Sequence, residues 1–276
     1  MTSAPRKALQ DSLSVNAKTL EGLHGLYLGG SFGRGVEDDW SDLDSVAVAE
    51  PDQIADLVNR WIALVSAQTE IVYTAKRLFP ATALVNLITQ DWVRCDLFIE
   101  TSERFKNRAQ DGLLVVLEHT PLYTTLPLKT TPPEIKPDAL TAAVEGFLRV
   151  LGLSHLAYQR DDPFTAQWGV ALLRDQIRIF NLALVPSAGL AGALSLMREL
   201  PKDRAARLED LPVGGADMAT ILKAQVDLAQ RFLPDARVQC DHVGARWPSD
   251  FVTATSGVLR GVMDKTFCDW LARQAG

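Results

Sequence analysis

A proline-rich segment, residues 129–137, divides the chain into two parts with different patterns. It holds three prolines in nine residues, a composition typical of a linker. Before it, short apolar runs that suit strands alternate with helical patterns, whereas after it the apolar spacing is helical almost throughout. We therefore expect an α+β domain over residues 1–128 and an all-helical domain over residues 129–276, both of ordinary domain size.

Apolar periodicity predicts the elements within each part. In the first part we expect strands at 23–29, 43–49, 69–75, 83–89 and 92–100, and helices at 5–22, 31–35 and 52–66. In the second part, Asp162-Pro163 is typical of a helix start, because aspartate is a favoured N-cap and proline suits the first helical position. That helix should run to about residue 185, and further helices are expected at 190–200, 216–233 and 250–273.

The composition, 47% hydrophobic and 22% charged, is that of a soluble globular protein. Its three cysteines, Cys95, Cys240 and Cys268, show no paired spacing, which favours a reducing compartment over a disulfide framework. No apolar segment of the signal-peptide type follows the first residues, and polar residues, proline and glycine interrupt the apolar run 177–197. We expect a cytoplasmic protein without a membrane span.

The net charge of −6 lies entirely in the first part of the chain. Residues 1–126 carry 17 acidic and 11 basic side chains, and the remaining residues carry 17 of each. No basic stripe is visible, so a nucleic acid is not an expected partner. An acidic half favours divalent cations and cationic small molecules.

Two aspartates, Asp42 and Asp44, come at the start of the strand expected at 43–49. Alternate residues of a strand face the same way, so both carboxylates should project from one side, about 7 Å apart at the backbone. Carboxylates that close repel each other unless a cation lies between them, and Mg²⁺ accepts such ligands. The alternative is that Ser41-Asp42 only caps a turn.

A glycine-rich turn, Gly29-Gly30-Ser31-Phe32-Gly33, follows the strand expected at 23–29. Between a strand and a helix, Gly30 and Ser31 would present backbone N–H groups and a hydroxyl to an anion. The turn lacks both the Gly-Lys-Ser/Thr of a P-loop and the third glycine of a dinucleotide-binding loop. The alternative is a tight turn that needs glycine for its backbone angles alone.

The same five residues also satisfy the G-x-S-x-G pattern of a serine hydrolase. Ser31 would then be the nucleophile, with a downstream aspartate and one of His119, His155 or His242 completing a triad. Against this, only one strand precedes Ser31, and Asp42 and Asp44 would have no role.

Taken together, Gly30-Ser31, Arg34-Gly35 and Ser41-Asp42-x-Asp44 followed by an apolar strand resemble the signature of the polymerase-beta-like nucleotidyltransferase superfamily. Within it, the chain is similar to the bacterial aminoglycoside and lincosamide nucleotidyltransferases. The resemblance spans about residues 23–120 and implies a mixed sheet with helices. It further implies that Gly30 and Ser31 hold a triphosphate and that Asp42 and Asp44 bind two Mg²⁺ ions. Ser45, usually aliphatic in the family, and Gly33, often alanine, depart from the pattern.

The resemblance also requires a third carboxylate on a later strand, and Asp96 falls where it should. Asp96 would complete the metal site and draw the proton from the attacking hydroxyl. Glu100, on the same strand face, is an alternative base, although plain surface exposure is the simpler expectation for it. Arg34 either contacts a phosphate or forms a surface salt bridge with Glu37 or Asp38.

These features predict a Mg²⁺-dependent enzyme that moves a nucleoside monophosphate, AMP in the first instance, from a nucleoside triphosphate to a hydroxyl of a small molecule, releasing pyrophosphate. A catalytically inactive nucleotide-binding or regulatory module is one alternative, and the serine hydrolase is another. The expected partners are ATP or another nucleoside triphosphate and a small-molecule acceptor, with no nucleic acid and no membrane.

Overall fold

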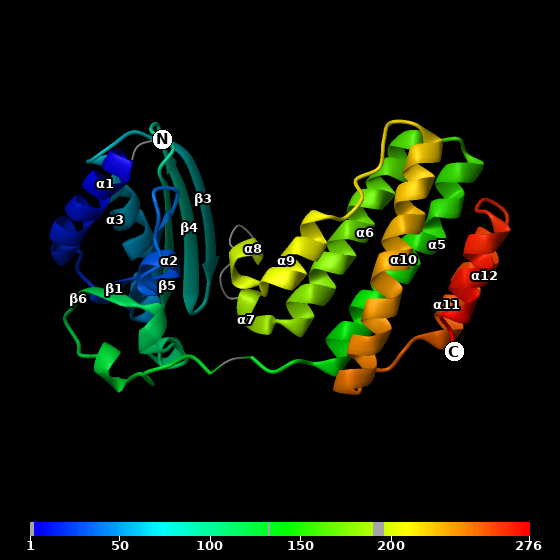
Figure 1. Cartoon of the computed structure of the whole chain (residues 1–276). Helices are drawn as coiled ribbons and strands as arrows, with labels where there is room; N and C mark the ends of the chain where they lie inside the picture. Colours follow the sequence, from blue (N-terminus) through cyan, green and yellow to red (C-terminus); the bar gives the residue numbers. More distant parts are fainter. Residues whose placement is uncertain (1–2, 132, 190–195) are drawn as a thin grey trace. The chain divides into compact units, whose positions relative to one another are not determined.

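The computed structural model describes residues 3–131, 133–189 and 196–276, and these form two compact units (Figure 1). The first unit spans residues 1–131 and the second residues 132–276, so the division falls within the proline-rich segment. The first unit contains a six-stranded mixed sheet with helices, and the described residues of the second are helical or irregular. The expected fold class, an α+β unit followed by an all-helical unit, is confirmed.

The sheet of the first unit has the strand order β3-β4-β5-β2-β1-β6. Its strands are β1 (Leu23–Leu28), β2 (Leu43–Ala49), β3 (Ile71–Phe79), β4 (Thr82–Thr89), β5 (Arg94–Glu100) and β6 (Leu114–Glu118). Neighbouring strands are antiparallel except β2 and β5, which run parallel. Since parallel strands begin at the same edge of a sheet, the first residues of β2 and β5 lie side by side.

One face of the sheet carries the main core of the unit. Helices α1 (Ser3–Asn16) and α3 (Ile54–Ser66) cover this face, as Figure 1 shows for the blue and teal helices beside the strands. Leu57, Trp61 and Val65 recur at helical spacing along α3 and are buried there. Alternate residues of β4 and β5, among them Leu87 and Leu97, point into the same core.

The opposite face is covered only in part. A small cluster around Tyr27, Val46, Val48 and Phe105 packs there against α4 (Ser102–Phe105) and the segment that follows β6. Most of the remaining positions on this face of β5 and β4, Arg94, Asp96 and Asn86 among them, are only half-buried. This face therefore leaves polar side chains accessible where β2 and β5 begin.

Short elements complete the first unit, and the end of β3 differs from expectation. They are α2 (Gly30–Gly33) and the 3₁₀ turns η1 (Ala17–Thr19), η2 (Pro51–Gln53), η3 (Gln110–Gly112) and η4 (Tyr123–Thr125). Strand β3 extends to Phe79, beyond the expected end at residue 75, and forms a hairpin with β4. As an edge strand it is largely exposed, so Lys76 and Arg77 interrupt its apolar pattern without ending the strand.

The second unit is a bundle built on three long helices, α5 (Pro137–Gln159), α6 (Pro163–Leu184) and α10 (Met218–Val243). Asp162 caps α6 by accepting a hydrogen bond from the backbone N–H of Thr165, so the expected helix start is confirmed. Among the described residues, only α5 is long and apolar enough to cross a membrane by length and composition, and Leu140, Val144 and Phe147 on it are buried in the bundle core.

The chain after α10 forms two helices, so the single helix expected at 250–273 is wrong. These are α11 (Ser249–Leu259) and α12 (Lys265–Arg273), and Asp264 restarts the helix by capping α12 at Phe267. The short helices α7 (Pro186–Gly189), α8 (Leu196–Glu199) and α9 (Lys202–Glu209) lie between α6 and α10. Most of the helix expected at 190–200 falls on residues 190–195, outside the described residues.

Candidate metal and phosphate site

Three aspartates converge at the common starting edge of β2 and β5. Asp44 and Asp96 are direct neighbours in the parallel register of the two strands, and Asp42 comes two residues before Asp44. One carboxylate oxygen of each lies within 4.8 Å of those of the other two. The chain thus brings together the three side chains proposed as metal ligands, from positions more than fifty residues apart.

Burial and mutual repulsion disfavour the ionised forms of these carboxylates. Burial and the nearby charges of Asp42 and Asp96 raise the pKa of Asp44 to about 6. Burial and Asp42 also raise the pKa of Asp96, and a hydrogen bond from the Asn86 side chain, opposite it in β4, partly offsets the rise. The carboxylates repel one another, so a cation between them would be bound favourably.

An arginine that the sequence analysis did not single out balances part of this charge. Arg94 begins β5, and its Nη2 lies 3.1 Å from Oδ2 of Asp42. Its positive charge lowers the pKa values of Asp44 and Asp96. Sequence alone could have found this pairing only by assuming the parallel register of β2 and β5.

The turn before Asp42 is held by contacts of its own. Asp38 accepts a hydrogen bond from the Ser41 hydroxyl at 2.9 Å, and the Asp38 N–H donates to the same hydroxyl oxygen at 2.9 Å. Arg6 of α1 donates to the carbonyl oxygens of Asp38 and Ser41, and its guanidinium lies over the ring of Phe32, 5.2 Å from the centroid. Ser41 therefore does form a turn, and that turn positions Asp42.

The glycine turn packs directly against the aspartates. The N–H of Gly29 donates to the carbonyl oxygen of Asp44 at 2.8 Å, which ties the turn to β2. Gly30 has φ +56°, and a Cβ on it would lie 1.9 Å from Oδ2 of Asp44. A side chain at this position would displace the carboxylate, so the turn needs glycine for its backbone angles and also for its approach to Asp44.

A second close approach involves Gly33. A Cβ on Gly33 would lie 2.0 Å from the carbonyl oxygen of Gly112 in η3. The backbone of α2 packs so tightly on that turn that an alanine at this position does not fit. Gly33 is accounted for by packing within this chain.

Ser31 stands at the start of α2 with its hydroxyl oxygen buried and without a hydrogen-bond partner. A buried hydroxyl without a partner is unfavourable, so the Ser31 hydroxyl is available to bond to a ligand or to a water molecule. No histidine lies within hydrogen-bond distance of this oxygen in the described chain, so the base that a serine nucleophile requires is missing.

Arg34 and Glu100, the two other residues considered for the site, lie in different environments. Arg34 is exposed, and its positive charge lowers the pKa of Asp44, which puts it within electrostatic reach of the cluster. Glu100 is only 4% exposed and forms an ion pair with Arg108, so the expectation of surface exposure is wrong. The ion pair and the covering segment after β5 bury a carboxylate that the strand pattern placed in water.

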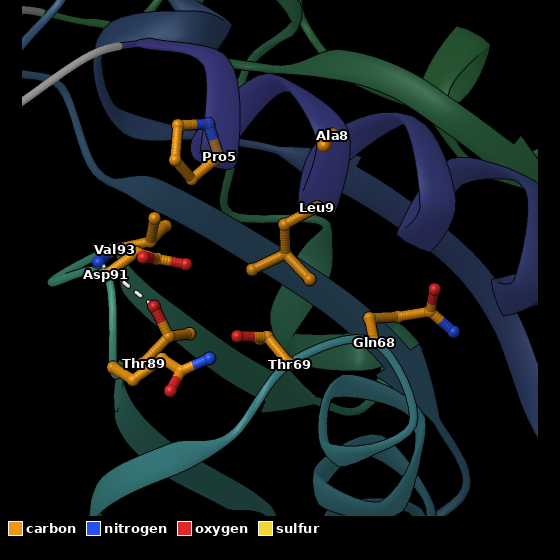
Figure 2. A pocket seen from close by; sticks show the side chains of 9 residues that line it. Pro5, Ala8, Leu9, Gln68, Thr69, Thr89, Asp91 and Val93 are labelled. Carbon is orange, nitrogen blue, oxygen red and sulfur yellow. Dashed lines mark hydrogen bonds between the residues drawn. The ribbon is translucent and has the colours of Figure 1, made fainter.

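A pocket of about 260 Å³ lies elsewhere in the first unit (Figure 2). Pro5, Ala8 and Leu9 of α1 line one side of it. Another side is lined by Thr89, the last residue of β4, and by Val93 just before β5, whose N–H donates a hydrogen bond of 3.2 Å to the Thr89 hydroxyl. Thr89 and Val93 alternate with residues on the aspartate face, so they point to the helix-covered face of the sheet. None of the three aspartates lines this pocket.

Comparison with known proteins gives structural likeness only. No family model matches the chain, and no curated protein matches it. The structure of an aminoglycoside 6-adenyltransferase from Bacillus subtilis is similar with a TM-score of 0.36 and 11% identity, covering 91% of this chain and 96% of that one. A nucleotidyltransferase-like protein from Exiguobacterium sibiricum 255-15 is similar with a TM-score of 0.39 and 10% identity, covering 97% and 87%. Both are of the class that the sequence motif resembles, and at these TM-scores the function has to be argued from this chain's own residues.

Proposed function

We propose that this chain is a Mg²⁺-dependent nucleotidyltransferase that transfers AMP from ATP to a hydroxyl of a small molecule, with release of pyrophosphate. The observation that carries the proposal is the contact of Gly30 with Asp44. It joins a carboxylate cluster of the kind that holds Mg²⁺ to a glycine turn whose Ser31 hydroxyl lacks a partner.

The donor set fits the metal. Three carboxylates with oxygens within 4.8 Å of one another are hard ligands of the kind Mg²⁺ prefers, and their mutual repulsion favours a cation. We assign Asp42, Asp44 and Asp96 as ligands of two Mg²⁺ ions. When bound, the metal lowers the pKa of the attacking hydroxyl and stabilises negative charge on the phosphoryl oxygens.

The chain's own residues then have distinct roles. The Ser31 hydroxyl and the backbone of Gly30 hold the triphosphate, and Arg34 adds positive charge near it. The acceptor oxygen forms a bond to the α-phosphorus while the bond from that phosphorus to the bridging oxygen of the β-phosphate breaks. Pyrophosphate takes the electron pair of the broken bond, and Asp96 accepts the proton of the acceptor hydroxyl.

The acceptor is assigned as a small molecule because the chain has no basic stripe for a nucleic acid. The acidic surplus of the first part suits a cationic acceptor. All the residues given roles lie within residues 1–128, which we assign as the catalytic domain, with residues 129–276 as a helical domain. Three buried free cysteines suit a cytoplasmic enzyme.

Two other functions make different predictions. An inactive nucleotide-binding module would bind ATP without turnover, and a serine hydrolase would act without metal through Ser31. The unpartnered Ser31 hydroxyl speaks against the hydrolase, because it has no adjacent base.

The test incubates ATP labelled at the α-phosphate with Mg²⁺ and a panel of aminoglycosides, lincosamides and other hydroxyl acceptors. Transfer of the label to the acceptor and release of pyrophosphate are both measured. We expect label on an acceptor, dependent on Mg²⁺ and lost in Asp42→Asn and Asp44→Asn. Labelled ATP that binds without turnover would favour the inactive module. Unchanged activity in a variant that carries both Asp42→Asn and Asp44→Asn would exclude the proposed function.

A further inference from the structure

Arg94 occupies a position that the proposed reaction does not by itself explain. It lies on β5 two residues before Asp96, so both side chains project from the same face of the sheet. Its Nη2 is 3.1 Å from Oδ2 of Asp42, in an ion pair whose side chains are 36% and 23% exposed. The guanidinium is therefore one of the groups that surround the carboxylate cluster.

This ion pair engages the carboxylate of Asp42, one of the three side chains proposed to bind metal. A carboxylate oxygen that accepts a charge-assisted hydrogen bond is a weaker metal ligand than a free one, because the guanidinium already neutralises part of its charge. The charge of the three aspartates, formally −3 when all are ionised, is reduced by Arg94 at the oxygen of Asp42 itself. Metal binding must either displace the guanidinium or accept a weakened ligand.

Arg34 provides a comparison within the same site. It also lowers the pKa of Asp44, but it is exposed and acts on Asp44 through charge at a distance. Interactions between exposed charges are strongly screened, whereas a direct contact between partly buried groups is screened less. Of the two arginines, Arg94 is the one placed to compete with a cation.

We propose that Arg94 is a built-in counter-ion that competes with Mg²⁺ for Asp42, so that free metal binds weakly and is held firmly only together with the triphosphate. The proposal rests on the metal site of the proposed function. In the nucleotide-free protein, Arg94 keeps the three carboxylates together without a metal. When the triphosphate arrives, its oxygens supply further metal ligands and further negative charge, and both favour the metal over the guanidinium.

The test measures metal affinity rather than activity. Mn²⁺, a paramagnetic substitute for Mg²⁺, is titrated into the protein without nucleotide, and free Mn²⁺ is followed by electron paramagnetic resonance. We expect Arg94→Gln to bind Mn²⁺ at least roughly tenfold more tightly than the unaltered protein, and Arg34→Gln to change the affinity by less than roughly threefold. With a non-hydrolysable ATP analogue present, the advantage of Arg94→Gln should shrink.

A double substitution tests whether Arg94 acts through the carboxylate of Asp42. If Arg94 acts through Asp42, the gain from Arg94→Gln disappears in an Asp42→Asn background, because the contested ligand is already lost. Equal or weaker Mn²⁺ binding by Arg94→Gln, in a protein whose melting curve shows it is folded, overturns the role of Arg94 while leaving the metal site intact. Mn²⁺ affinity that is the same in Asp42→Asn and in the unaltered protein overturns the metal site itself, and with it the proposed function.

Discussion

The α-carbon of Gly30 faces the carboxylate of Asp44 so closely that a Cβ on Gly30 would stand 1.9 Å from Oδ2 and 2.8 Å from Cγ. This relationship joins the two halves of the motif, the glycine turn and the aspartates, into one site. The turn and the carboxylate can lie this close only because residue 30 has no side chain.

The first prediction is that Gly30→Ala abolishes activity while the protein remains folded. The carboxylate of Asp44 is the mobile end of a side chain, so it can turn aside from the new methyl group and leave the cluster. The left-handed backbone at φ +56° adds a destabilisation of about 1 kcal/mol. Pyrophosphate release should fall by at least about 100-fold, the scale of losing a placed catalytic group.

Gly35 offers a matched control for this substitution. It has φ +66°, and a Cβ on it would meet no atom within 4 Å. Gly35→Ala therefore carries the same backbone strain without the clash. We expect a similar drop in thermal stability and near-normal activity, and equal losses of activity in the two variants would contradict the argument.

The second prediction concerns the unpartnered hydroxyl of Ser31. Its removal in Ser31→Ala should leave the free energy of unfolding unchanged or raise it by about 1 kcal/mol, because a buried hydroxyl without a partner is unfavourable. The KM for ATP should rise about tenfold through loss of one hydrogen bond to phosphate. Denaturant unfolding and steady-state kinetics measure the two effects. As a control, Ser14→Ala removes a hydroxyl that donates to the Gln10 carbonyl within α1, and it should leave the KM unchanged.

The third prediction is a dependence of stability on pH in the metal-free protein. The pKa of Asp44 is raised to about 6 by folding, from an ordinary value of 3.8, so the folded state holds the proton more tightly than the unfolded chain. The stabilisation that comes from proton binding at Asp44 is fully present below pH about 4, and it is lost as the pH rises through about 6. Asp44→Asn, which cannot ionise, should thus be more stable than the unaltered protein above pH 6, on the order of 1 kcal/mol after allowance for screening at a partly exposed group.

Melting temperatures between pH 4.5 and 8 in the presence of a chelator measure this difference. The stabilisation by Asp44→Asn should decrease as the pH falls from 6 toward 4. Addition of Mg²⁺ together with a non-hydrolysable ATP analogue at pH 8 should reverse the order, because metal binding stabilises only the protein that retains the ligand. Asp52→Asn, at an exposed position in η2, serves as the control, and the same trend in that variant would contradict the assignment to Asp44.

Much of the fold was predictable because local patterns carry it. Period-two and helical spacing located β1, β2, β4 and β5, α6 and part of α10, and the Asp162-Pro163 pair located the start of α6. The predicted range of β3 ended too early, because an edge strand does not need alternating apolar residues. The break between α11 and α12 was missed because Asp264 restarts the helix without a proline to mark the interruption.

Some residues of the candidate site were likewise predictable from local patterns, and others were not. Asp42, Asp44 and the glycine turn lie within fifteen residues, so their spacing could be interpreted directly. Arg94 and Asn86 contact the aspartates only through the register of β5 with β2 and β4, and no local pattern encodes that register. The same holds for Arg6, which reaches the turn before Asp42 from more than thirty residues away.

The fourth prediction separates the two carboxylates of β5 that could serve as base. Asp96 belongs to the cluster, whereas Glu100 lies four residues further along the strand, about 13 Å away at the backbone. Glu100 is engaged by Arg108, whose guanidinium also lies over the ring of Phe98 at 5.5 Å from the centroid. A carboxylate held in this way is a structural partner of Arg108 and too distant to accept a proton at the cluster.

Glu100→Gln should therefore lower the free energy of unfolding by about 1 kcal/mol, because it leaves the charge of the half-buried Arg108 unpaired, and should keep most of the activity. Asp96→Asn should reduce pyrophosphate release by at least about 1,000-fold with little loss of stability, because it removes both a metal ligand and the proton acceptor. Paired measurements of unfolding and turnover on the two variants test this. A folded Glu100→Gln protein as inactive as Asp96→Asn would transfer the role of base to Glu100.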